Sequence, residues 1–293
     1  MTSASIPTAK GAQAPFAVRR NSPGVLPGFG ISMGYAVLYL SVLVLIPLAA
    51  LPIKSASLGW QGFWDAVTAP RVLASYQLTF GASLLAALVN LVFGTIVAWV
   101  LVRYRFPGRR LVDALVDLPF ALPTAVAGIA LTTLFAANGW FGGPLSHLGI
   151  KVAYTPLGII VAMSFTSIPF IVRTVQPVLE ELDPALEEAG QTLGASDLSI
   201  FASVILPLLA PALLAGVSLS FARSLGEFGA IIFIAGNQPF STEITALLAF
   251  IRLEEYDYPA SAAIASVMLL TAFVMLALTN LMQARALRYT ARG

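Results

Sequence analysis

Residues 84–102 read LLAALVNLVFGTIVAWVLV, without a single charged side chain. The stretch lies inside a longer uncharged run, residues 72–102, and lacks the apolar/polar alternation of a membrane β-barrel strand. A helix needs about 20 consecutive, mostly apolar residues to cross the hydrocarbon core of a bilayer. Because backbone polar groups find no water there, the segment must satisfy them internally. The stretch therefore predicts a membrane-spanning α-helix.

The rest of the chain repeats this pattern. Of its 293 residues, 58% are hydrophobic and 10% are charged, whereas soluble domains carry about 25% charged residues. So few charged residues argue against a cytosolic enzyme, a disordered protein and a nucleic-acid binder that works by neutralising phosphates. We therefore expect an all-α integral membrane protein, a six-helix transmembrane bundle. Its five other long uncharged runs are residues 21–53, 118–150, 152–172, 198–222 and 258–284.

The amino-acid composition limits the chemical reactions that this chain could catalyse. The chain has no cysteine and one histidine, His147, so we expect no metal site, no catalytic residue and no membrane-embedded enzyme. We expect His147 to be a surface residue on an outer loop. A phosphate-binding P-loop needs a lysine that follows a glycine, and Lys10, Lys54 and Lys151 do not. Any ATP chemistry must reside on another polypeptide.

Basic residues indicate the orientation, because Lys and Arg concentrate in short cytoplasmic loops. We expect both termini in the cytoplasm, with Arg223 left out of the comparison because it lies within a hydrophobic region. The cytoplasmic segments would then hold eleven basic residues: Lys10, Arg19, Arg20, Arg103, Arg105, Arg109, Arg110, Arg173, Arg285, Arg288 and Arg292. The opposite side would hold four: Lys54, Arg71, Lys151 and Arg252.

The expected organisation follows from these runs. We predict a cytoplasmic tail (1–30), a first helix (31–53), a domain of five further helices (72–284) and a cytoplasmic tail (285–293). Arg19-Arg20 before an apolar run could suggest a twin-arginine signal. The apolar run is longer than a signal core of 7–15 residues, so we expect an uncleaved helix.

An acidic loop separates the fourth and fifth runs. Residues 176–197 contain six acids and no Lys or Arg, although this loop is placed in the cytoplasm. Asp183-Pro184 is a typical helix start, Gly194 a typical end, and Ser196 or Asp197 can begin a second helix. A solvated linker is the alternative, but a linker has no need for apolar residues such as Ile200 and Phe201. We predict a helix–glycine–helix knob within residues 184–207.

This knob resembles the EAA loop of binding-protein-dependent ABC importer permeases of type I. The family pattern E-A-A-x-x-x-G-x(9)-I-x-L-P is matched except at Gly190, usually alanine, and mildly at Val204. The resemblance implies a coupling helix that sits in a cleft of an ATP-hydrolysing subunit. The residues that would form this ATPase-coupling loop are Glu187, Glu188, Ala189, Gly190, Leu193, Gly194, Ala195, Leu206 and Pro207.

Four further blocks resemble the T-type membrane subunits of bacterial sulfate/thiosulfate importers. They are RYRFPGR (103–109), DLPFALPTAVAG (117–128), SIPFIVRTVQP (167–177) and RSLGEFGA (223–230). The second and fourth blocks also occur in molybdate permeases. The presence of the first helix, the overall length, and the segments 234–237 and 256–259 favour sulfate.

The resemblance implies a non-catalytic permease subunit of the bacterial inner membrane that moves sulfate or thiosulfate. Its partners would be a homologous second permease chain, two ATP-binding subunits that hold ATP and Mg²⁺, and a periplasmic sulfate/thiosulfate-binding protein. Membrane lipid would surround it, and we expect no bound cofactor and no nucleic acid. The alternatives are a permease for molybdate or another oxyanion and, less favoured, an ion-coupled secondary carrier.

Two groups of residues are candidates for the translocation pathway or its gate. Pro119 and Pro123, followed by Thr124, lie four apart and would share one helix face, either as a structural kink or as a polar lining. Arg223, Ser224 and Glu227 form the second group. Arg223 and Glu227 are four apart in a hydrophobic region, so they would either neutralise each other or contact the passing anion.

Overall fold

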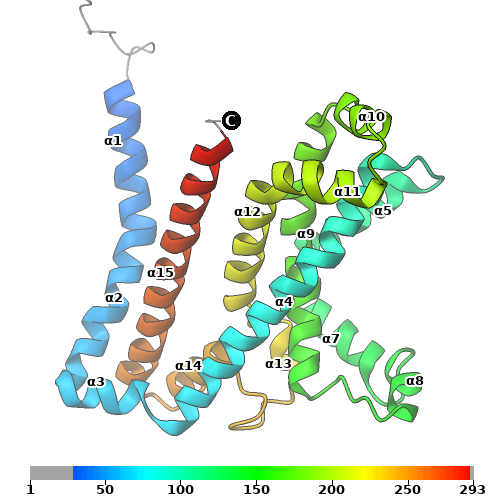
Figure 1. The fold of residues 1–293 in the computed structure, drawn as a ribbon. Coiled ribbons are helices and arrows are strands. Elements are labelled where there is room, and N and C mark those ends of the chain that lie inside the picture. Colours follow the sequence, from blue (N-terminus) through cyan, green and yellow to red (C-terminus); the bar gives the residue numbers. More distant parts are fainter. Residues whose placement is uncertain (1–28, 291–293) are drawn as a thin grey trace, which may run out of the picture. The chain divides into compact units, whose positions relative to one another are not determined.

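The computed structural model describes residues 29–290, with side chains described as far as residue 281, and this part is helical throughout apart from connecting loops. The expected N-terminal tail up to residue 28 and the last three residues of the C-terminal tail lie outside the described residues. The helices (Figure 1) are α1 (Phe29–Leu40), α2 (Ile46–Ser55), α3 (Gly59–Val67), α4 (Pro70–Arg103), α5 (Arg109–Val116), α6 (Leu118–Ala121), α7 (Thr124–Phe135), α8 (Gly142–His147), α9 (Pro156–Glu181), α10 (Ala185–Thr192), α11 (Asp197–Ile200), α12 (Leu206–Leu225), α13 (Ile231–Ile234), α14 (Thr245–Glu254) and α15 (Tyr258–Thr290). Two π-helical turns, Ser41–Leu45 and Phe201–Ile205, and a 3₁₀ turn, Ala56–Leu58, join some of them.

The all-helical membrane class is confirmed. Among the described residues, five helical segments are long and apolar enough to cross a bilayer. They are Phe29–Val67, Pro70–Arg103, Pro156–Glu181, Asp197–Leu225 and Tyr258–Leu281. Five of the six expected runs thus lie in long helices, although the last helix continues to Thr290, beyond the expected start of the C-terminal tail.

The run 118–150 does not form one span, in contrast to the expectation. Leu122 adopts an extended conformation (φ −85°, ψ 134°), as residues before proline often do, and Pro123 has no N–H to continue the helix. The run divides into α6, α7 and α8, and α7 is only 12 residues long. Pro119 belongs to α6 and Pro123 precedes α7, so the expected shared helix face does not exist.

The chain divides into two units, residues 1–48 and 49–293. In the first unit, the described residues form α1, a π-helical turn and the start of α2, and no side chain in α1 is buried. Ile31 and Tyr35 are among its exposed apolar side chains. Such a helix depends on lipid or on another protein surface for its burial.

The second unit is built around α4, α9 and α12, which pack on one another. One apolar cluster contains Ala86, Ile159 and Met163, and another contains Leu101 and Leu179. Lipid tails are as apolar as the helices, so association depends on close packing and on interhelical hydrogen bonds. The small residues on α4 permit this close packing.

A buried amide also joins these three helices. The Asn90 Nδ2 group of α4 donates to the Ser164 carbonyl (3.0 Å) and to Ser167 Oγ (2.9 Å) of α9. It also donates to Ser220 Oγ of α12 at 3.3 Å. The side chains of Asn90, Ser167 and Ser220 are all buried. Hydrogen bonds therefore fix the relative positions of the three central helices.

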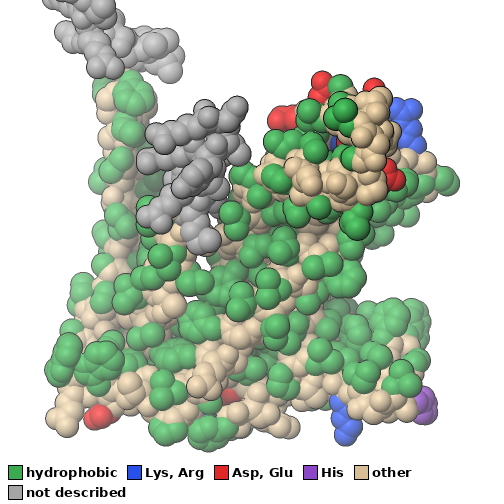
Figure 2. Space-filling model, viewed as in Figure 1, with side chains coloured by type: hydrophobic (Ala, Val, Ile, Leu, Met, Phe, Trp, Pro, Cys, Tyr) green, Lys and Arg blue, Asp and Glu red, His purple; other side chains and the backbone are tan. Residues whose placement is uncertain are grey.

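Two groups of short helices, with the loops that join them, lie at opposite ends of this unit (Figure 1). α5, α10 and α11 lie at one end, called here the α10 end, and α3, α8 and α14 lie at the other, the α14 end. Figure 2 shows hydrophobic side chains over the flank between the ends and most of the visible charged ones at the ends. This distribution fits a bundle that crosses a bilayer.

Candidate functional site

The glycine turn of the knob is a Schellman motif. The Ala195 N–H donates to the Gly190 carbonyl (3.1 Å), and the Gly194 N–H donates to the Gln191 carbonyl (2.9 Å). Gly194 has φ +80°, a left-handed conformation that glycine adopts without steric cost. The turn therefore ends α10 and reverses the chain within a few residues, as the sequence predicted.

The two helix starts also follow the prediction. The Ala185 N–H donates to Asp183 Oδ1 at 2.9 Å, and Ser196 Oγ accepts from the Ser199 N–H at 3.3 Å. The second helix is longer than expected, because α11 continues through a π-helical turn into α12, forming one segment from Asp197 to Leu225. A movement of the knob would thus act directly on a membrane-spanning helix.

The glutamates of α10 have different surroundings. Glu187 forms an ion pair with Arg103 at the end of α4, whereas Glu188 is exposed. Gly190 lies against Ile200, and a Cβ at this position would come within 2.9 Å of Ile200 Cγ1. The glycine that departs from the family pattern thus allows α10 and α11 to approach closely, a gain that partly offsets its lower helix propensity.

Arg103 links the knob to the bundle. Its guanidinium carbon lies 5.5 Å from the centre of the Trp99 ring, in cation–π geometry. Arg103, Trp99 and Glu187 line part of an open pocket of about 520 Å³ between α4, α10 and α11. On the outside of the knob, Leu193 is 87% exposed and Leu198 is 77% exposed. The knob therefore presents a charged inner face and an apolar outer tip.

A second link joins α9 to α5. The Arg173 guanidinium donates to both Asp117 carboxylate oxygens (2.8 and 2.6 Å) and to Asp113 Oδ1 (2.6 Å). It also donates to the Asp113 carbonyl (2.9 Å) and to Gln176 Oε1 (2.7 Å). From the sequence, Arg173 is predicted only to lie on the cytoplasmic side of the membrane. The clamp formed by Arg173, Asp113 and Asp117 connects the helix that leads into α10 with the segment that leads into Pro119.

The Arg223–Glu227 pair forms where α12 ends. Arg223 Nη1 lies 2.7 Å from Glu227 Oε2, and Glu227 is 1% exposed while Arg223 is 29% exposed. Glu227 Oε1 also accepts from the Ala230 N–H at 2.9 Å. Glu227 therefore both neutralises Arg223 and holds the loop between α12 and α13.

The structure brings the two candidate pathway groups together. A Cβ on Gly128 of α7 would lie 2.4 Å from the Ala230 carbonyl oxygen, which is too close for any side chain. The backbone of α7 is therefore in direct contact with the backbone at Ala230. A Cβ on Gly229 would lie 2.1 Å from Thr124 Oγ1. The start of α7 thus packs directly on the loop that Glu227 holds.

The remaining candidates have different environments. Pro119 is buried and Pro123 is exposed. Ser224 is fully buried and donates to Ser167 Oγ at 3.1 Å, so its hydroxyl extends the Asn90 network. Within the described residues, no group of three or more His, Asp or Glu side chains could hold a metal ion.

The α14 end holds a further ion pair that the sequence does not predict. Arg71 donates from Nε to Glu243 Oε2 (2.7 Å) and from Nη2 to Oε1 (2.6 Å), and Glu243 is buried. Beside it, Thr79 Oγ1 accepts from the Thr245 N–H at 2.9 Å. These contacts fix the start of α14 on α4.

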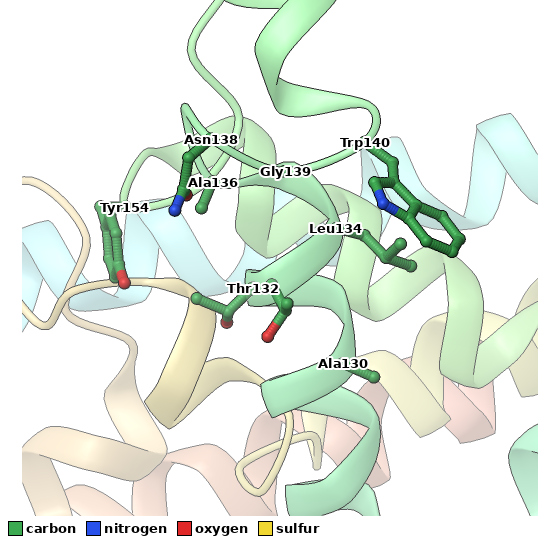
Figure 3. Close-up of a pocket in the computed structure, with 9 residues that line it drawn as sticks. Ala130, Thr132, Leu134, Ala136, Asn138, Gly139, Trp140 and Tyr154 are labelled. Atoms are coloured by element: carbon green, nitrogen blue, oxygen red, sulfur yellow. The ribbon is translucent and has the colours of Figure 1, made fainter.

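A pocket of about 730 Å³ also lies near this end, between α7 and the loop before α8. Figure 3 shows Asn138 and Tyr154 on one side of it and Trp140 on the other. Thr132 and Thr133 contribute hydroxyl groups to the lining. Both hydroxyls are bonded to carbonyls of their own helix, so few polar groups are free to fix a ligand there.

Comparison with known proteins extends these findings. Residues 90–288 match the family described as "Binding-protein-dependent transport system inner membrane component". The chain is 57% identical over 265 residues to the sulfate transport system permease protein CysT of Salmonella typhimurium, covering 90% of this chain and 96% of that protein. It is 50% identical over 253 residues to the CysT protein of Synechocystis, covering 86% and 88%.

The fold is similar to that of a solved transporter subunit. A chain of the bacterial alginate ABC transporter, solved with an alginate pentasaccharide-bound periplasmic protein, superposes with a TM-score of 0.72. The match covers 87% of this chain and 93% of that chain, at 18% sequence identity. At this identity the comparison supports the fold alone.

The Schellman turn generates a test at Gly194. In Gly194→Val, a β-branched residue must adopt a left-handed conformation, which costs about 1–2 kcal/mol. We expect this variant to insert in the membrane normally but to lose most of the ATPase subunit that co-purifies with the wild type. Gly194→Asn is the matched control and should retain more, because asparagine tolerates this conformation. Undiminished co-purification with Gly194→Val would show that the turn is only a linker.

Proposed function

The chain belongs to the family of inner membrane components of binding-protein-dependent transport systems, and we propose that it is the membrane-spanning permease subunit of an ATP-driven sulfate importer. The identity of 57% to a sulfate permease along almost the whole length carries this proposal. The chain is a multi-pass, non-catalytic protein of the inner membrane. A transport system of this kind includes a binding protein and an ATPase.

The finer assembly is also part of the proposal. A homologous second permease chain would complete the pathway, and two ATP-binding subunits would hold ATP and Mg²⁺. A periplasmic protein would deliver sulfate or thiosulfate. The excess of basic residues on one side supports cytoplasmic termini, with the α10 end facing the ATPase.

The contacts of α10 support its role as the coupling helix. Its outer face offers Glu188 and the apolar tip at Leu193 to a partner, while its inner face is joined to α4 through Glu187 and Arg103. When ATP closes the ATPase dimer, α10 would move with it. Two connections would carry the movement into the bundle: the continuous α11–α12 segment and the Arg173 clamp.

The pathway would run beside the junction of α7 with the α12–α13 loop. Sulfate is a dianion, and its burial in hydrocarbon without compensation is prohibitive, so the pathway must offer water or hydrogen-bond donors. Movement of α12 would displace Arg223 and the loop that Glu227 holds, and the loop would displace Thr124. Pro123 allows α7 to move independently of α6. We assign Pro119, Pro123, Thr124, Arg223, Ser224 and Glu227 to this gate region.

Transport measurements test the proposed substrate. In a strain that lacks this chain, we expect the wild-type chain to restore uptake of labelled sulfate, and thiosulfate to compete for that uptake. Gly194→Val serves as the uncoupled control. Restoration of molybdate uptake without sulfate uptake would show that the transported substrate is another oxyanion and not sulfate. Sulfate uptake that continues without the ATPase subunit would contradict an ATP-driven importer.

The Arg223–Glu227 pair can be tested by a double-mutant cycle. Arg223→Gln leaves the buried Glu227 carboxylate without its partner, so we expect a large loss of assembled complex and of uptake. Glu227→Gln should also impair the protein, and the double variant should recover much of the loss because no uncompensated charge remains. Uptake is normalised to the amount of complex. A double variant as inactive as Arg223→Gln, together with a mild Glu227→Gln, would instead place Arg223 in contact with the anion.

A further inference from the structure

The segment between α4 and α6 presents a basic surface. Arg105 and Arg110 are exposed and Arg109 is half-buried. None of these three arginines forms an ion pair within the part of the chain that the structure describes. Three neighbouring cations without carboxylate partners repel one another, so the surface favours an anionic partner.

The acidic side of α5 is not available to balance these charges. Asp113 and Asp117 both bind Arg173 of α9, so this side faces the bundle. On the other side, Leu111 and Leu115 lie one helical turn apart and are 65% and 52% exposed. α5 is therefore an amphipathic helix whose outer side combines an apolar stripe with flanking arginines.

The position of this surface matches the edge of the bilayer. The membrane-spanning segment of α4 ends at Arg103, and α5 begins six residues later. Tyr104 is exposed at this boundary, where aromatic side chains are favoured. Phe106 packs against the apolar cluster of α4 and α9 and keeps the loop close to the bundle. Figure 2 shows basic side chains gathered at this end of the molecule, on the side of α5 and α10.

We propose that α5 and the preceding loop, residues 104–116, rest on the membrane surface, with Leu111 and Leu115 among the acyl chains and Arg105 and Arg110 on anionic phospholipid headgroups. Basic amphipathic helices bind membranes in this way, because their apolar side inserts while their long cationic side chains reach the headgroups. Each cation near an anionic surface strengthens the association about fivefold.

Lipid fits this surface better than a protein partner does. The candidate docking face for the ATPase is the tip of α10 with Glu188 and Leu193, which is acidic and apolar, not basic. The α5 surface starts where a membrane span ends, so an apolar stripe there lies at the depth of the acyl chains.

Through the Arg173 clamp, the contact of α5 with lipid would also affect the coupling helix α10. Arg173 fixes α5 to α9, and α9 continues to Glu181, just before α10. A helix held on the lipid surface would thus hold the base of the coupling helix at a defined depth. This part of the inference rests on the proposed function, whereas lipid contact itself does not depend on transport.

Quenching of a fluorescent label tests the contact directly, because the chain has no natural cysteine. In the purified complex in vesicles, a label on Leu111→Cys or Leu115→Cys should be quenched by spin-labelled lipid and protected from aqueous iodide. The control, Glu181→Cys at the exposed end of α9, should respond far less to the lipid quencher. Quenching of the α5 labels by iodide alone, or protection from both quenchers by a covering protein, would overturn the proposal.

Anionic lipid tests the role of the arginines. With the sulfate-loaded periplasmic binding protein present, we expect ATP hydrolysis by the wild-type complex to rise when phosphatidylethanolamine vesicles receive about 30% phosphatidylglycerol. The double variant Arg105→Gln/Arg110→Gln should lose most of this rise, and Arg105→Lys/Arg110→Lys should keep it. The control Arg252→Gln, in α14 at the opposite end of the unit, should behave as the wild type. An unchanged rise in the glutamine variant would contradict the proposal. Failure of that variant to assemble in either lipid would assign the surface to a protein partner. If the sulfate-loaded periplasmic binding protein does not stimulate ATP hydrolysis by the wild-type complex, the proposed function fails while the quenching result still stands.

Discussion

Lipid provides neither water for a stranded polar group nor a hydrophobic force that draws apolar helices together, and the central bundle is built under this constraint. Asn90 on α4 satisfies its amide on α9 and α12, and Ser167 accepts from Ser220 and Ser224. These bonds are directional, so they fix the register of the three helices. Apolar packing alone would allow the helices to slide or rotate.

Charged groups follow the same logic. Arg71, Arg103, Arg173 and Arg223 each have a carboxylate from another segment or from the next helical turn. Arg71 joins α4 to the start of α14, Arg103 joins α4 to α10, and Arg173 joins α9 to α5. These three pairs therefore connect elements that are distant in the sequence, whereas the arginines on the surface of α5 have no such partner, which points to lipid.

Part of this organisation could be predicted from the sequence because it is local. The long uncharged runs specify membrane helices, and Gly194 with its neighbours specifies the turn of the knob. Residues 118–150 do not form the single span that their lack of charge predicts, because counting charges takes no account of proline. The pair Leu122-Pro123 breaks the helix, so Pro119 and Pro123 do not share a face.

Long-range pairing could not be predicted. Arg173 lies 56 residues from Asp117, Arg103 lies 84 from Glu187, and Arg71 lies 172 from Glu243. No periodicity links residues so far apart, and several carboxylates could serve each arginine. The contact of Thr124 with Gly229 was equally hidden, since it depends on backbone approach. The i, i+4 spacing of Arg223 and Glu227 is a local signal, and this pair does form.

We propose that the α10 end faces the cytoplasm, where an ATPase can act on it. Labelling of single cysteines in intact cells with a membrane-impermeant maleimide tests this claim most directly, since the chain has no cysteine of its own. We predict that His147→Cys, exposed at the α14 end, is labelled, while Leu193→Cys reacts only after the membrane is opened and the ATPase is removed. Labelling of Leu193→Cys from outside intact cells, with protection of His147→Cys, would reverse the orientation and contradict the coupling role of α10.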